Sequence, residues 1–75
     1  MSIYDRFNGL GAEMDALRRA MAAVPNGTLD ARDWDALEGL MHRLSAERRE
    51  VGEQLYAAAK SAAEQVIAER ERRNR

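Results

Sequence analysis

The chain has 75 residues, no cysteine and a formal net charge of −1. This length permits one small domain, and the lack of cysteine excludes disulfides, thiolate metal sites and a cysteine nucleophile. The near-neutral charge gives no sign of a dominant electrostatic partner such as duplex DNA. Apolar residues make up 45% of the chain, but 14 of them are alanine, and only 19 larger ones remain when Met1 is set aside. So few side chains make a thin core for an independent monomer.

Two features of the sequence bear on where the protein works. No apolar run approaches the ~20 residues that a membrane span needs. Asp5 lies close to the N-terminus, and no basic segment followed by an apolar one marks a secretory signal. We therefore expect a soluble cytoplasmic protein with no membrane partner, in the host cytosol if the gene belongs to a phage.

The first predicted element is a helix over about residues 3–24. Ser2 and Asp5 have the spacing of a capping pair at its start. Its larger apolar residues recur at alternating intervals of four and three, which is the pattern of a coiled-coil seam. This first seam consists of Ile3, Phe7, Leu10, Met14, Leu17, Met21 and Val24.

A turn over residues 25–29 separates this helix from the second. Pro25 lacks an N–H group and disfavours helix at the residue before it. Asn26 and Gly27 tolerate the positive φ that a tight turn requires. Asp30 and Asp33 then have the spacing of a helix cap, so we expect a second helix over about residues 30–73.

The second helix carries a matching seam, and the two seams pair. Its members are Trp34, Leu37, Met41, Leu44, Arg48, Val51 and Leu55. When the chain folds back at the turn, each residue of the first seam lies opposite one of the second, from Val24 with Trp34 to Ile3 with Leu55. The two residue numbers of every pair add up to the same value, which is the condition for a single antiparallel register. The sequence therefore predicts an all-α antiparallel helical hairpin, one domain over residues 1–75. Its first helix is about 33 Å long and its second about 65 Å.

Residues 56–75 project beyond the first helix in this arrangement. Their apolar spacing has two successive steps of four, as in a coiled-coil stutter, and we expect residues 70–75 to form a charged, frayed end. The alanines here either fill an exposed helix, since alanine is the best helix former, or let a second helix approach closely. The second interpretation predicts a homodimer with a four-helix or coiled-coil arrangement. Its candidate dimer face is Ala58, Ala59, Ala62 and Ala63.

Six residues are candidates for contact with a protein partner. Five are larger apolar residues that the paired seams leave over, and the sixth is the charged residue within a seam. Arg48 lies opposite Leu10, and three interpretations are open for it. Its stem packs while the guanidinium reaches water, or it forms a register-fixing ion pair with Glu47, Glu13 or an acid of another protomer, or it contacts a partner. The six candidates are Tyr4, Leu40, Arg48, Tyr56, Val66 and Ile67.

The sequence offers no residues for catalysis, for a metal or for a cofactor. His42 is the only histidine, so neither a metal site nor a catalytic triad can be assembled around it. Pairs of acids at helical spacing are explained by capping and by surface ion pairs. No glycine-rich phosphate loop is present. We expect that the chain is not an enzyme.

Three functions are compatible with these features. The first is a non-enzymatic protein–protein interaction module, possible for a small phage- or mobile-element-encoded modulator that binds and inhibits a host protein such as a transcription regulator or an ATPase. The second is a coiled-coil assembly subunit or a chaperone. The third, a dimeric regulator that binds RNA or DNA, follows from a resemblance.

That resemblance lies in the two heptad seams around Pro25-Asn26-Gly27. In outline the arrangement resembles the Rop family of plasmid copy-number proteins, in which two helical hairpins dimerise into a four-helix bundle and bind RNA. The unequal arms and the near-neutral charge differ from that pattern, and no residue is carried over. The nucleic-acid candidates are instead the basic residues of the C-terminal end, which also suit the dipole of a helix C-terminus. They are Arg70, Arg72, Arg73 and Arg75.

Overall fold

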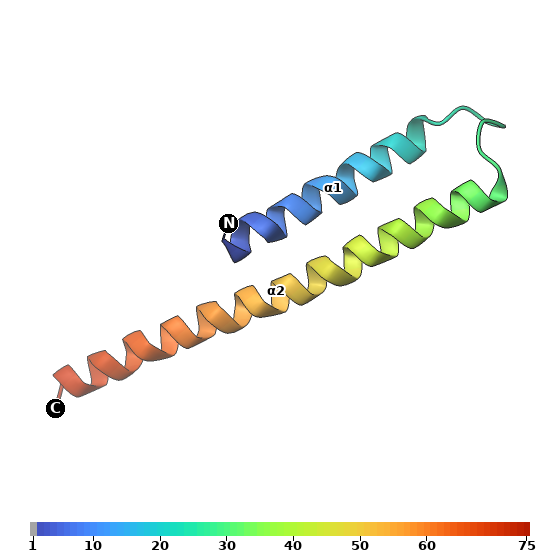
Figure 1. The fold of residues 1–75 in the computed structure, drawn as a ribbon. Helices are drawn as coiled ribbons and strands as arrows, with labels where there is room; N and C mark the ends of the chain where they lie inside the picture. Colours follow the sequence, from blue (N-terminus) through green and yellow to red (C-terminus); the bar gives the residue numbers. More distant parts are fainter. Residues whose placement is uncertain (1) are drawn as a thin grey trace.

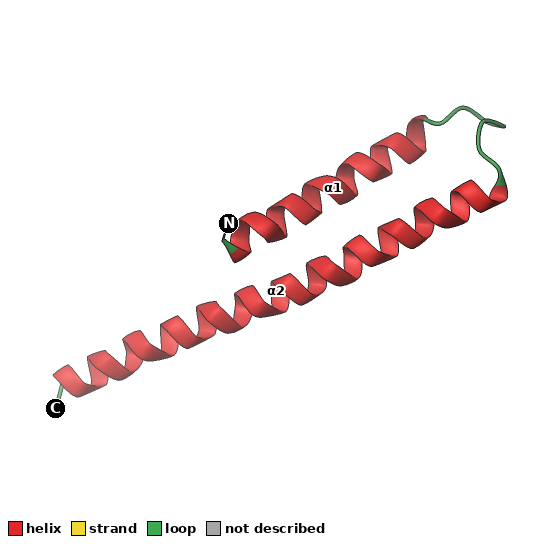
Figure 2. Ribbon diagram, in the orientation of Figure 1, coloured by secondary structure: helices red, strands yellow, loops and turns green. Residues whose placement is uncertain are grey.

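The computed structural model describes residues 2–75, which form two helices and contain no strand. Helix α1 spans Ile3–Ala23 and helix α2 spans Ala31–Arg73. The chain turns back after α1, so that α2 runs antiparallel beside it (Figure 1), and loops occupy only the turn and the two ends (Figure 2). The all-α prediction is confirmed and the arrangement is that of a hairpin. The molecule measures 71 Å along its longest axis and 18 and 17 Å across.

Both helices begin at side-chain caps. The Ser2 hydroxyl accepts a hydrogen bond of 3.0 Å from the backbone N–H of Asp5. At α2 the bonds are reciprocal, because the Asp30 carboxylate accepts from the Asp33 N–H at 2.9 Å and the Asp33 carboxylate accepts from the Asp30 N–H at 3.2 Å. These bonds satisfy N–H groups that have no partner within a helix. The capping residues are those that the sequence predicts.

The turn is built as the proline and glycine require. Val24 ends α1 in an extended conformation immediately before Pro25. The N–H of Thr28 donates to the carbonyl of Pro25 at 3.2 Å. Gly27 has a φ of +83°, in the left-handed region that costs a residue with a Cβ about 1–2 kcal/mol.

A single seam between the helices forms the core. Leu10 and Val51 are buried, with 7% and 2% of their surface exposed. The other members of both predicted seams are half-buried, apart from Ile3, which is just over one third exposed. A Cβ added to Gly52 would lie 3.1 Å from the Phe7 ring. This close approach agrees, to within one residue, with the predicted register, which pairs Phe7 with Val51.

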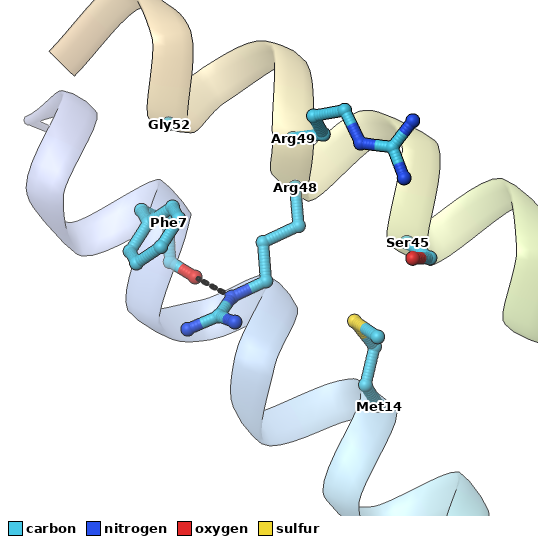
Figure 3. A pocket seen from close by; sticks show the side chains of 6 residues that line it. All are labelled: Phe7, Met14, Ser45, Arg48, Arg49 and Gly52. Carbon is cyan, nitrogen blue, oxygen red and sulfur yellow. Dashed lines mark hydrogen bonds between the residues drawn. The ribbon is translucent and has the colours of Figure 1, made fainter. Parts of the chain in front are cut away.

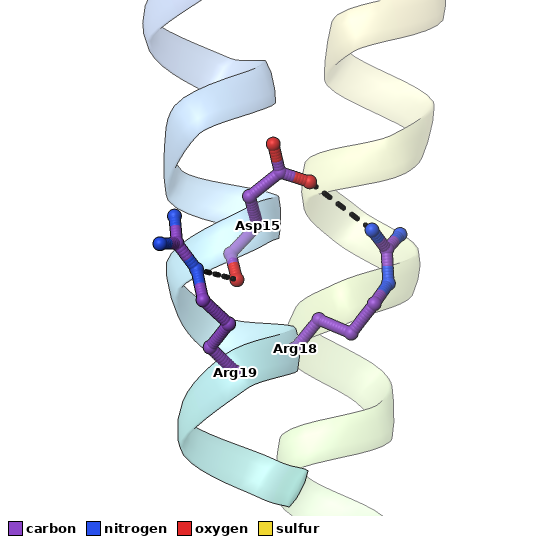
Figure 4. Close-up of polar contacts among 3 residues, drawn as sticks. All are labelled: Asp15, Arg18 and Arg19. Atoms are coloured by element: carbon purple, nitrogen blue, oxygen red, sulfur yellow. Dashed lines mark hydrogen bonds and ion pairs between the residues drawn. The ribbon is translucent and has the colours of Figure 1, made fainter.

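Ion pairs add little to the hairpin. Within the described part of the chain, one ion pair joins the two helices, between Arg6 and Glu47 at 3.1 Å. Within α1, the exposed Asp15 accepts from Arg18 at 3.1 Å through its carboxylate and from Arg19 at 3.4 Å through its backbone carbonyl (Figure 4). Exposed pairs of this kind contribute about 0–1 kcal/mol each. The apolar seam therefore holds the helices together.

Candidate interaction surface

Helix α2 continues well beyond the end of α1, and we call this part, residues 56–73, the bare arm. Figure 1 shows it as the orange and red end of α2, with no other helix beside it. Every residue of the bare arm is exposed. Three of these residues are large and apolar: Tyr56 is 71% exposed, Val66 50% and Ile67 55%.

The bare arm continues the seam that α1 covers nearer the turn. Ala59, Ala62 and Val66 follow Leu55 at steps of four, three and four residues. With 3.6 residues in each turn, these steps keep the side chains on the same side of α2. Ala58 lies on one flank of this stripe. On the other flank lie Ala63, Tyr56 and Ile67. The apolar face of α2 is therefore covered by α1 up to Leu55 and is uncovered from there to the C-terminal end of the helix.

The start of α1 lies at the base of the bare arm. Phe7 is beside Gly52, and Ile3 and Tyr4 lie one helical turn earlier, level with Leu55 and Tyr56. Tyr4 is 59% exposed. The hairpin thus brings Tyr4 level with Tyr56, where the bare arm begins.

Leu40 lies apart from this surface. It precedes Tyr56 on α2 by 16 residues, or about 24 Å along the helix axis. It is 37% exposed, close to the 38% of Ile3 at the end of the seam. Of the apolar partner candidates, Tyr56, Val66 and Ile67 lie on the bare arm and Tyr4 lies level with its start, whereas Leu40 lies nearer to the turn.

Arg48 packs on Phe7. Its Cζ lies 4.0 Å from the centroid of the Phe7 ring, and its Nε donates to the Phe7 carbonyl at 3.4 Å (Figure 3). A Cβ on Gly11 would come within 3.0 Å of the same guanidinium, so the missing side chain makes room for it. Among residues 2–75 no carboxylate lies within ion-pair distance of Arg48, and Glu47 pairs with Arg6 instead.

The sequence does not predict the contact between Arg48 and Phe7. The ion pair of Arg48 with Glu47 or Glu13, which is one of the three interpretations of the sequence, is not formed. The predicted pairing of the two helices could have indicated this contact, because it places Arg48 beside Gly11 and one helical turn from Phe7. A glycine next to an arginine in a paired seam indicates where the guanidinium has space.

A shallow hollow adjoins Arg48. It has a volume of about 210 Å³ and is lined by Phe7, Met14, Ser45, Arg48, Arg49 and Gly52 (Figure 3). This lining offers cations, a hydroxyl and apolar atoms, but neither a carboxylate nor an imidazole that could act as a general base. A second hollow, near the turn, is lined by Leu29, Asp33, Ala36 and Leu37, mainly through apolar atoms, and the Asp33 carboxylate is engaged in the cap of α2.

The remaining titratable residues lie on the surface. His42 is exposed on α2. In the part of the chain that the structure describes, no three histidines, cysteines or acids gather to hold a metal ion. Arg70, Arg72 and Arg73 occupy the exposed last turn of α2, and Arg75 follows it. Neither of the two helices described is long and apolar enough to span a membrane.

Comparisons of the chain with protein-family models, with curated proteins and with solved structures found no match.

Proposed function

We propose that this chain is a non-enzymatic protein-interaction module, which binds by pairing its bare arm with a helix of another polypeptide. The observation that carries the proposal is the seam that continues along α2 after α1 has ended. Fully burying a large apolar side chain is worth about 1.5–3 kcal/mol. Because Tyr56, Val66 and Ile67 are still at least half exposed, a covering helix would gain about 1 kcal/mol or more from each.

The geometry favours binding by a helix over binding by an extended segment or a small molecule. Ala59 and Ala62 along the middle of the bare arm let another helix axis come close, and the larger residues beside and beyond them supply contact area. A modulator built this way would act in the cytoplasm by laying the arm on a helix of its target and covering that surface. We propose a host transcription regulator or ATPase as the target.

A pair of variants tests the proposal. Ile67→Glu places a charge on the apolar face of the bare arm, whereas Ala68→Glu adds the same charge on the next residue, which points away from that face. Each immobilised protein is exposed to nuclease-treated lysate of the native host, and circular dichroism checks that both variants keep the wild-type helix content. We expect one host protein to bind the wild type and Ala68→Glu, to be lost with Ile67→Glu, and to behave in the same way when purified.

Two outcomes would contradict the proposal. Equal capture by all three proteins would show that the bare arm is not the binding surface. Capture from untreated lysate that is lost from nuclease-treated lysate would show that the binding depends on a nucleic acid.

A further inference from the structure

We propose that the helix pairing with the bare arm is the bare arm of a second copy of this chain, in antiparallel orientation. The inference rests on the proposed function. It states that the arm binds a second copy of the chain when the target protein is absent. Three features of the chain support it: the continuity of the seam, the distribution of large and small side chains, and the distribution of charge.

Continuity of the seam sets the orientation. Up to Leu55 the seam of α2 packs against an antiparallel helix, α1, and the stripe on the bare arm continues it. A second bare arm, also antiparallel, would lie in line with α1 and extend the same packing. The C-terminal end of the second α2 would then point at the N-terminal end of α1. These two helix ends carry partial charges of opposite sign, so the arrangement is favourable.

The side chains of the bare arm are complementary to themselves. When the two-fold axis lies near the middle of the arm, Val66 and Ile67 of each copy fall opposite alanines of the other. With the axis between residues 64 and 65, Val66 of one copy lies opposite Ala63 of the other, and Ile67 lies opposite Ala62. Large side chains therefore meet small ones on both sides of the two-fold axis, as close helix packing requires.

The charges select the antiparallel orientation over the parallel one. At the end of the arm, Arg70, Arg72 and Arg73 outnumber Glu69 and Glu71. Glu50 and Glu53 outnumber Arg49 just before the arm, and none of these residues forms an ion pair within residues 2–75. An antiparallel overlap brings the basic end of one copy towards the acidic segment of the other. A parallel overlap would instead place the two basic ends together. Exposed pairs contribute little affinity, but they discriminate between orientations.

The resulting dimer is a rod with one hairpin at each end. Two helices of 43 residues that overlap over the bare arm span about 100 Å. A target helix would have to displace the second copy, so binding of the target would weaken as the concentration of the protein rises.

Mass and orientation can be measured on the full chain. In sedimentation equilibrium from low to high micromolar concentration, we expect the wild type and Ala68→Glu to reach twice the monomer mass of 8.4 kDa. Ile67→Glu should remain at the monomer mass. Because the chain has no cysteine, Arg75→Cys takes a single spin label. An antiparallel overlap puts the two labels about 30 Å apart, whereas a parallel one brings them within about 15 Å.

Three results would overturn the inference: a monomeric wild type throughout this range, a dimer that Ile67→Glu leaves intact, or the short distance between labels. The proposed function fails separately. If the wild type is monomeric but a target is captured and then lost with Ile67→Glu, only the self-pairing is wrong. If the dimer forms as described but no target depends on Ile67, the proposed function fails and the self-pairing stands.

Discussion

Two glycines of α2 have different surroundings, and replacing each with alanine separates helix propensity from packing. A Cβ at Gly39 would meet no atom within 4 Å, whereas a Cβ at Gly52 would lie 3.1 Å from the Phe7 ring. Alanine is better than glycine inside a helix by about 0.8–1.0 kcal/mol. Gly39→Ala should therefore raise the free energy of unfolding by about 1 kcal/mol, which corresponds to about 4–8 °C in Tm for a chain of this size.

Gly52→Ala gains the same propensity but meets the ring of Phe7. The ring has to move by a few tenths of an ångström within the seam. Overpacking of a core costs about 1–3 kcal/mol, and a half-buried ring belongs at the lower end of that range. The gain and the cost nearly cancel, so we expect Gly52→Ala to be about 1 kcal/mol less stable than Gly39→Ala.

The measurement is thermal and urea unfolding followed by circular dichroism. All proteins are compared at one concentration, because self-association makes Tm depend on concentration. Equal stabilisation by the two substitutions would refute the reasoning. Phe7 would then not approach Gly52 in solution, and the register of the hairpin would be wrong.

Three further substitutions test other parts of the hairpin. Asp30→Ala removes the cap of α2 and should lower the free energy of unfolding by about 1 kcal/mol in a urea titration. Gly27→Ala, at a positive φ, should cost about 1–2 kcal/mol in the same assay, whereas Gly9→Ala, with open space around it, should stabilise. Arg48→Met loses a long hydrogen bond and a cation–π contact but gives an uninterrupted apolar seam, so stability should change by less than about 1 kcal/mol. A larger loss would show that Arg48 fixes the fold.

The course of the backbone followed from the sequence because three local signals agree. Serine and aspartate caps, a proline–glycine turn and two seams with alternating steps all specify the same hairpin. The paired spacing also gave the register, since two helices with a single shared seam have few ways to align. The ends of the helices agree with the expected ranges to within about one residue.

The surroundings of individual side chains were harder to predict. The position of Arg48 in the seam was evident, but its contact depends on the space left by Gly11 and on the orientation of the Phe7 ring. Spacing along the chain does not report either of these. The exposure of the apolar residues that the paired seams leave over was predicted for Val66, Ile67 and Leu40 alike, although Leu40, beside the seam, is the least exposed.

Two residues that are buried in the described part of the chain, 2–75, determine where the backbone of the hairpin resists hydrogen exchange with solvent. Leu10 and Val51 lie in the half of the seam that is nearer to its open end, far from the turn. Amide hydrogens near them should exchange most slowly, because releasing them requires the whole seam to open. Protection should fall in both directions from that point, towards the turn and more steeply into the bare arm. A rise in protection confined to residues 56–73 would then map the footprint of whatever helix binds there, even before that helix has been identified.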